Sequence, residues 1–146
     1  MRGPFRRLTD RVYVSQQISL AEVAEAARAG FGMIVNNRPE DESDDQTPGA
    51  EIEAAAAAAG LGYVAIPVTH AGFSQPQITA MADALASTDK PVLAYCRSGT
   101  RSTLLWALAQ ASRGTSPHSL AASAAQAGYD LGPIRAMLDM LAAQDR

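Results

Sequence analysis

The segment that most constrains the fold surrounds the only cysteine of the chain. An apolar run over residues 91–95 leads into Cys96, a glycine-containing loop follows through Arg101, and a helix-forming run covers residues 103–109. This order predicts a buried strand, a tight loop and the start of a helix. Such a loop directs several backbone N–H groups and a helix N-terminus at one point, so the sequence predicts an anion cradle with a thiol at its floor.

The chemistry expected of this cradle is nucleophilic catalysis. A thiol attacks as its thiolate, and the helix N-terminus, the loop N–H groups and the charge of Arg101 all favour the charged form. We therefore expect Cys96 to be largely thiolate at neutral pH. The alternative is an inert cysteine, since free cysteines are usually buried, but that would not explain the polar loop directly after it.

Loop length bears on the kind of substrate. Four residues separate Cys96 from Arg101, as in rhodanese sulfurtransferases, whereas cysteine-dependent phosphatases have five. The stretch from Tyr95 to Ser102 resembles the rhodanese loop closely. A phosphoryl group presents three equatorial oxygens that must all be held, and a shorter ring has less room for them but can surround one sulfur atom. The spacing therefore favours sulfur transfer over phosphoryl transfer.

The supply of a proton gives a second, weaker argument. Hydrolysis of a phosphate monoester needs a general acid for its leaving group, and cysteine phosphatases generally use an aspartate after an earlier strand. The matching segment, residues 66–73, has no aspartate, and His70 is its only candidate acid. Sulfite or a thiolate leaves without strong protonation. Another loop could still supply an acid, from Asp41, Glu42, Asp44 or Asp45.

Pieces spread along most of the chain resemble one bacterial family. Besides the cysteine loop, they are residues 12–17, 34–39, 63–68 and 127–131. The family is the phosphatase-like domain of beta-lactamase hydrolase-like proteins, also described as a sulfurtransferase family. The resemblance implies a dual-specificity-phosphatase-like fold, and it implies that Ser102, directly after the loop arginine, hydrogen-bonds the Cys96 sulfur. The family domain occurs alone or joined to a metallo-β-lactamase-like persulfide dioxygenase, which points to persulfide metabolism.

Composition narrows the function classes. The chain has 146 residues, 47% of them hydrophobic, which fits one catalytic domain over residues 1–146. A net charge of −3 without a basic block argues against a nucleic-acid partner. We expect no signal peptide and no membrane-spanning segment. One cysteine suits a reducing cytoplasm, and it leaves no second thiol, so a persulfide on Cys96 would pass to an outside acceptor.

Periodicity and turn residues predict the remaining elements. Expected strands are residues 12–14, 31–36, 63–68 and 92–95, and expected helices are residues 21–29, 51–59, 75–87, 103–111, 117–127 and 132–143. Their alternation predicts an α/β fold with a central, mostly parallel sheet of four to five strands and helices on both faces. The cysteine loop then lies at the carboxyl edge of the sheet, where such folds bind ligands.

Each predicted site residue has an expected role. Cys96 is the nucleophile, Arg101 orients the loop and offsets charge, and Ser102 completes the catalytic set. The loop N–H groups hold the anion, and the Arg97 side chain either attracts an anionic donor or is simply solvated. Arg38 either touches substrate or forms a salt bridge to the acidic loop that follows it. The predicted substrate-binding residues are Arg97, Ser98, Gly99, Thr100, His70 and Arg38.

The function expected from these patterns is that of a cytoplasmic sulfurtransferase. Cys96 takes a sulfane sulfur from thiosulfate or glutathione persulfide and passes it to a thiol or to cyanide. No metal or organic cofactor is implied, and the resemblance suggests a persulfide dioxygenase as a partner. Two alternatives stay open. One is a cysteine-dependent phosphatase with a phosphocysteine intermediate, and the other is a non-catalytic sulfur carrier or anion-binding module.

Overall fold

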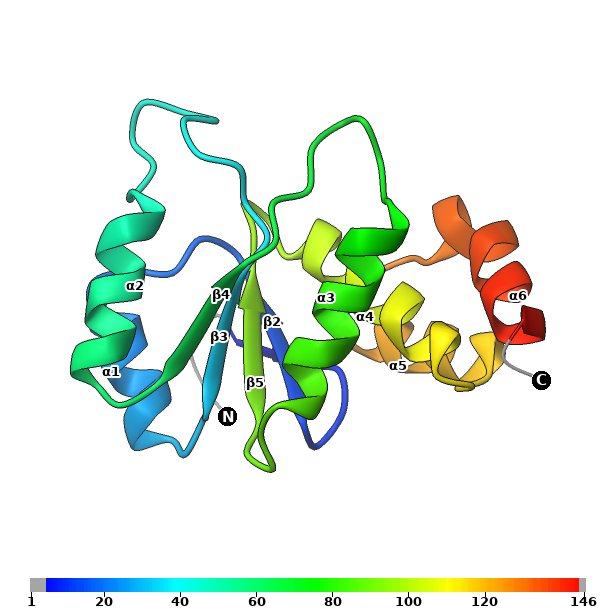
Figure 1. Ribbon diagram of the computed structural model, residues 1–146, viewed down its shortest axis with the longest axis horizontal. Helices are drawn as coiled ribbons and strands as arrows, with labels where there is room; N and C mark the ends of the chain where they lie inside the picture. Colours follow the sequence, from blue (N-terminus) through cyan, green and yellow to red (C-terminus); the bar gives the residue numbers. More distant parts are fainter. Residues whose placement is uncertain (1–4, 145–146) are drawn as a thin grey trace.

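A five-stranded sheet forms the centre of the computed structural model, which describes residues 5–144 (Figure 1). Its strand order is β1-β2-β5-β3-β4. Strands β2, β5, β3 and β4 run parallel, and β1 pairs antiparallel with β2 at one edge. The strands are β1 (Arg6–Arg7), β2 (Val12–Ser15), β3 (Met33–Asn36), β4 (Gly62–Ala65) and β5 (Val92–Tyr95). The predicted mostly parallel sheet is confirmed.

Helices cover both faces of this sheet, as predicted (Figure 1). Helices α1 and α2 lie together on one face, and the other four lie on the opposite face. The helices are α1 (Leu20–Arg28), α2 (Gly49–Ala58), α3 (Gln75–Ala86), α4 (Thr100–Ser112), α5 (Pro117–Gln126) and α6 (Arg135–Gln144), with a short 3-10 helix at Gly132–Ile134. No helix within residues 5–144 has the length and apolar character needed to cross a bilayer.

Two apolar cores result, one on each side of the sheet. The core beneath α1 and α2 contains Val23, Ile52 and Leu93, all fully buried. The core on the other side is larger and is built around α4, which is buried from Ser102 through Ala109. Because α4 touches the sheet, α3, α5 and α6, its N-terminus is held firmly behind the end of β5.

The helix starts follow from capping residues. Ser19 and Glu22 form the predicted capping box of α1, with the Ser19 hydroxyl accepting from the Glu22 N–H at 3.1 Å. Ser116 caps α5 in the same way by accepting from the Ser119 N–H, and Pro117 occupies the first turn. Each cap satisfies a backbone donor that the helix cannot satisfy internally.

The structure departs from the sequence expectation most clearly at three elements. The two-residue strand β1 was not expected, because two exposed arginines carry no strand periodicity. The strand predicted for residues 63–68 ends at Ala65, since Pro67 has no N–H to continue the ladder. The helix predicted for residues 132–143 begins as a 3-10 turn and becomes α-helical at Arg135.

The central strand gives a test of the fold. Leu93 is fully buried in the middle of β5, so Leu93→Ala should lower the free energy of unfolding by roughly 2–5 kcal/mol through lost burial and a residual cavity. Urea denaturation measures this change. Leu20→Ala is the control, because Leu20 is 45% exposed and its loss should change stability by less than about 0.5 kcal/mol. Equal effects of the two substitutions would contradict the described core.

Candidate active site

Cys96 lies at the carboxyl end of β5, between the ends of β2 and β3. Its side chain is fully buried, and its N–H donates to the Ser15 carbonyl at 3.3 Å. The sulfur accepts the Gly99 N–H at 3.1 Å. On the other side, the Asn37 N–H donates to the Tyr95 carbonyl at 2.8 Å. The predicted strand, loop and helix are therefore all present, and the thiol is at the floor of the loop.

Gly99 makes the change from loop to helix. It is the N-cap of α4 and has φ +92°, a left-handed conformation that favours glycine. A Cβ at this position would overlap the hydroxyl oxygen of Tyr129, a residue from the segment after α5. The Tyr129 hydroxyl in turn donates to the Ser98 carbonyl at 3.2 Å. The loop thus fits closely against a residue 31 positions away in sequence.

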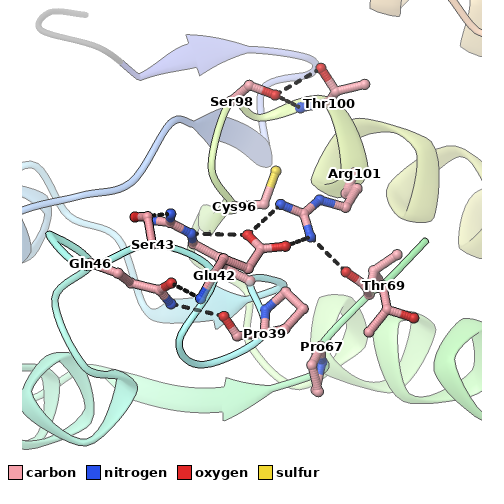
Figure 2. A network of polar contacts seen from close by, with 12 residues as sticks. Pro39, Glu42, Ser43, Gln46, Pro67, Thr69, Cys96, Ser98, Thr100 and Arg101 are labelled. Atoms are coloured by element: carbon pink, nitrogen blue, oxygen red, sulfur yellow. Dashed lines mark hydrogen bonds and ion pairs between the residues drawn. The ribbon is translucent and has the colours of Figure 1, made fainter. Parts of the chain in front are cut away.

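Arg101, in the first turn of α4, forms a two-point ion pair with Glu42 of the loop after β3. Its Nη1 donates to Glu42 Oε2 at 2.7 Å and its Nη2 donates to Glu42 Oε1 at 2.8 Å. Nη1 also donates to the Val68 carbonyl at 2.7 Å. Figure 2 shows Arg101 and Glu42 facing one another beside the Cys96 sulfur. Three segments are therefore joined at the rim of the cradle.

The pattern of these bonds leaves one side of the guanidinium for a ligand. A guanidinium carries five N–H donors in a planar fork. The hydrogen bonds of Arg101 to Glu42 and Val68 use both donors of Nη1 and one of Nη2. Within the described residues, no hydrogen bond engages its Nε–H or the second Nη2 donor. These two donors form the edge that grips an oxyanion at two points, so Glu42 orients Arg101 without occupying all of it.

Arg38 supports Glu42 from the opposite side. It is only 5% exposed, and its Nε donates to Glu42 Oε1 at 3.1 Å. Its Nη1 donates to Gln17 and its Nη2 donates to Ser43, both at 3.0 Å. Each nitrogen of Arg38 thus has a protein partner. The salt bridge to the acidic loop is therefore present, and the substrate contact of Arg38 stays a prediction.

The paired charges shift the titration of both partners. Hydrogen bonding from Arg101, followed by that from Arg38 and the charges of both arginines, outweighs burial and lowers the pKa of Glu42 to about 2. The hydrogen bond with Glu42 raises the pKa of Arg101, and the nearby Cys96 sulfur acts in the same direction. Glu42 is therefore ionised at neutral pH and in this arrangement cannot serve as a proton donor.

Ser102 has a different partner from the one predicted. Its hydroxyl donates to Asn37 Oδ1 at 2.8 Å, and the Asn37 amide donates to the Ile66 carbonyl at 3.0 Å. A hydroxyl has one proton to donate, so the expected donation from Ser102 to the Cys96 sulfur is corrected. Ser102 instead links the start of α4 to the strand ends of β3 and β4.

The other predicted site residues are spread around the loop. Ser98 and Thr100 are exposed, and the Ser98 hydroxyl donates to the Thr100 hydroxyl at 3.0 Å. Arg97 is exposed, and its charge contributes to lowering the pKa of Asp45, after hydrogen bonds from the Ser43 side chain and the Asp45 backbone. His70 is exposed and follows by two residues the Val68 carbonyl that Arg101 binds.

Sequence reasoning missed two contacts of the loop. Glu42 was considered only as one of several acids, and its ion pair with Arg101 spans 59 residues. Tyr129 fell within a resembling segment but had no assigned role. No spacing rule predicts such long-range pairs. Residues 5–144 contain no group of three or more His, Cys, Asp or Glu side chains that could hold a metal.

Comparison with known proteins identifies the family. The family described as "Beta-lactamase hydrolase-like protein, phosphatase-like domain" matches residues 4–113. The chain belongs to this family. It is 35% identical over 139 residues to a beta-lactamase hydrolase-like protein of Xylella fastidiosa, covering 94% of this chain and 32% of that protein. The chain thus spans about a third of the length of this relative.

Solved structures agree with the fold of this family. A protein of Neisseria meningitidis described as a candidate phosphatase superposes with a TM-score of 0.82 at 30% identity, covering 96% of this chain and 99% of that one. Tk-PTP in its active form superposes with a TM-score of 0.77 at 20% identity, covering 99% of both chains. The second likeness concerns the fold alone. The predicted dual-specificity-phosphatase-like fold is confirmed.

The ion pair at the rim predicts a pH-dependent contribution to stability. Because the pKa of Glu42 is lowered from 4.5 to about 2, its contribution is complete above pH 4.5 and is lost as the pH falls towards 2. Glu42→Gln should cost about 2–3 kcal/mol of unfolding free energy at pH 7, since it leaves two arginines without their counter-charge. Urea denaturation from pH 7 to pH 3 should show this difference shrinking below pH 4.5. A constant difference would contradict the assignment.

The close fit at Gly99 predicts a second effect. Gly99→Ala should destabilise the protein by about 1–3 kcal/mol, because the new Cβ meets both an unfavourable φ and the Tyr129 hydroxyl. It should also change the rate at which iodoacetamide alkylates Cys96. Repeating the substitution in a Tyr129→Phe background removes the overlapping oxygen and should reduce the cost. If the cost is unchanged in that background, the overlap is not its cause.

Proposed function

We propose that this protein is a cysteine-dependent phosphatase that hydrolyses phosphate monoesters through Cys96. The observation that carries the proposal is the sulfur at the end of the central strand, which accepts a loop N–H at 3.1 Å and lies beside Arg101. Among the described residues, no hydrogen bond engages the Nε–H or the second Nη2 proton of this arginine. The phosphatase-like family and the Neisseria structure support the same chemistry. The thiol must stay reduced, so we place the activity in the cytoplasm.

The proposed reaction has two displacement steps. In the first, the Cys96 thiolate attacks phosphorus, an S–P bond forms, and the ester P–O bond breaks with its electrons leaving on the alcohol oxygen. In the second, water attacks phosphorus, the S–P bond breaks, and inorganic phosphate and the thiolate are released. The loop N–H groups and the free edge of Arg101 hold the equatorial oxygens during both steps.

Proton supply limits the range of substrates. Glu42 is ionised, with a pKa of about 2, and the loop between β4 and α3 contains His70 in place of a carboxylate. We therefore propose that aryl phosphates are the preferred class, because a phenolate leaves with less need of a proton than an alkoxide does. His70 is the side chain that we propose as the proton donor.

A second candidate function is sulfur transfer, which the loop length favours. The ring has four residues between Cys96 and Arg101. Among the backbone donors of the described residues, only the Gly99 N–H hydrogen-bonds the sulfur. In this reaction the thiolate attacks the outer sulfur of thiosulfate, a new S–S bond forms, and sulfite leaves with the electrons of the old bond. A small thiol or cyanide then accepts the sulfur, and a persulfide dioxygenase would be a partner.

Parallel assays separate the two candidates. The purified protein is given 4-nitrophenyl phosphate in one assay, and thiosulfate with cyanide in the other. We expect release of 4-nitrophenolate, at a rate that falls on the order of 10³-fold or more in Cys96→Ser. Thermal unfolding reports whether this variant stays folded. Thiocyanate formation without phosphate release would overturn the phosphatase proposal in favour of sulfur transfer. A stable sulfur adduct without turnover in either assay would overturn both and indicate a carrier.

A further inference from the structure

A polar cavity adjoins the Cys96 loop on the side away from Glu42. Its volume is about 250 Å³, and it is lined by Arg6, Gln16, Ser98 and Tyr129. Ser98 belongs to both sites, because it is in the cysteine loop and also lines this cavity. In Figure 2, Ser98 and Glu42 lie on opposite sides of Cys96. The cavity is therefore separate from the rim formed by Arg101 and Glu42, yet it shares a loop residue with the cradle.

Three of the four lining residues come from separate segments and contact one another through Tyr129. The Tyr129 hydroxyl donates to the Ser98 carbonyl at 3.2 Å. The Arg6 guanidinium lies 5.8 Å from the centre of the Tyr129 ring, and its Nη1 donates to the Ala127 carbonyl at 3.0 Å. These contacts fix the arginine at one end of α5 and against an aromatic face. Its position is therefore set by the fold before any ligand arrives.

Arg6 differs from Arg101 and Arg38, because no carboxylate of the described residues pairs with it. Arg101 and Arg38 both pair with Glu42. Among the described residues, no carboxylate lies within ion-pair distance of Arg6. Its only described hydrogen-bond partner is a carbonyl, which uses one of five donors. The nearest acidic residue in sequence to Tyr129 is Asp130, whose carboxylate accepts from the Gly132 N–H at 2.8 Å.

We propose that this cavity binds a second acidic group, a carboxylate or phosphate, on the substrate that reacts at Cys96. The proposal rests on the function proposed for the cysteine loop. Arg6 supplies the charge, and the Gln16 amide supplies a further donor around the same space. The favoured substrates are therefore phosphate esters with a separate anionic group, because a singly anionic ester fills only the cradle.

Two esters that differ by one carboxylate test this preference. They are N-acetyl-O-phosphotyrosine and N-acetyl-O-phosphotyramine. We expect the unaltered protein to hydrolyse the first with a kcat/KM about fivefold higher, the size typical of a partly exposed ion pair. Gln16→Glu places a negative charge in the cavity without changing side-chain size or any described contact of Arg6, and it should abolish or reverse the preference. Arg6→Gln should do the same.

Arg7→Gln is the matched control for Arg6→Gln. It removes the same charge one residue along β1, from a side chain that pairs with Asp10 and does not line the cavity. The preference should be retained in this variant. An equal loss in Arg7→Gln would attribute the effect to overall charge and overturn the proposal. The proposal would equally be overturned if the two esters had the same kcat/KM in the unaltered protein.

A binding measurement distinguishes failure of the subsite from failure of the phosphatase activity. The Cys96→Ser protein is titrated with succinate while the NMR signals of the Arg6 Nε–H and the Tyr129 N–H are followed. Saturable shifts that disappear in Gln16→Glu support an anion site even if neither ester is hydrolysed, in which case only the phosphatase proposal fails. If succinate binds but the two esters are hydrolysed with the same kcat/KM, the cavity binds a free anion and has no role in substrate choice. That result would overturn the proposal.

Discussion

The ionised carboxylate of Glu42 is the group on which the geometry of the site depends. It pairs with Arg101 from the first turn of α4 and with the buried Arg38 after β3, so one side chain joins the start of α4 to the loop after β3. Without this carboxylate, the two arginines that pair with it would repel each other. Because Glu42 accepts hydrogen bonds from both Nη1 and Nη2 of Arg101, the orientation of the guanidinium is fixed. The edge formed by its Nε–H and second Nη2 proton therefore has a fixed direction.

Local patterns predicted most of the fold and the centre of the site. The apolar run before Cys96 and the helix-forming run after it place the thiol at the end of β5, because a strand, a tight loop and a helix can be arranged there in few ways. Ser19 and Ser116 located two helix starts correctly. Strand β1 was missed, because a two-residue edge strand of arginines is stabilised by its pairing with β2 and by no pattern of its own.

The roles of side chains far apart in sequence were harder to predict. The resemblance implied that Ser102 would bind the sulfur, yet it binds Asn37, which only the three-dimensional approach of β3 and α4 brings within 2.8 Å. Arg38 was a candidate substrate contact because it follows the end of a strand. Its burial depends on how the next loop folds over it, which no local sequence pattern predicts. The loop length from Cys96 to Arg101 favoured sulfur transfer, whereas the family and the Neisseria structure favour the phosphatase that we propose.

The packing of α4 has a consequence for how this unit can be divided. The family match ends at residue 113, directly after α4, but α6 packs against that helix and Tyr129 reaches back to the loop. A fragment that ends at residue 113 would expose the side of α4 that Leu138 and Leu141 cover. It would also lack Tyr129, which packs against Gly99. The carboxy-terminal helices therefore support the Cys96 loop through α4 and Tyr129. Substitutions in these helices can change the reactivity of Cys96 without contacting it.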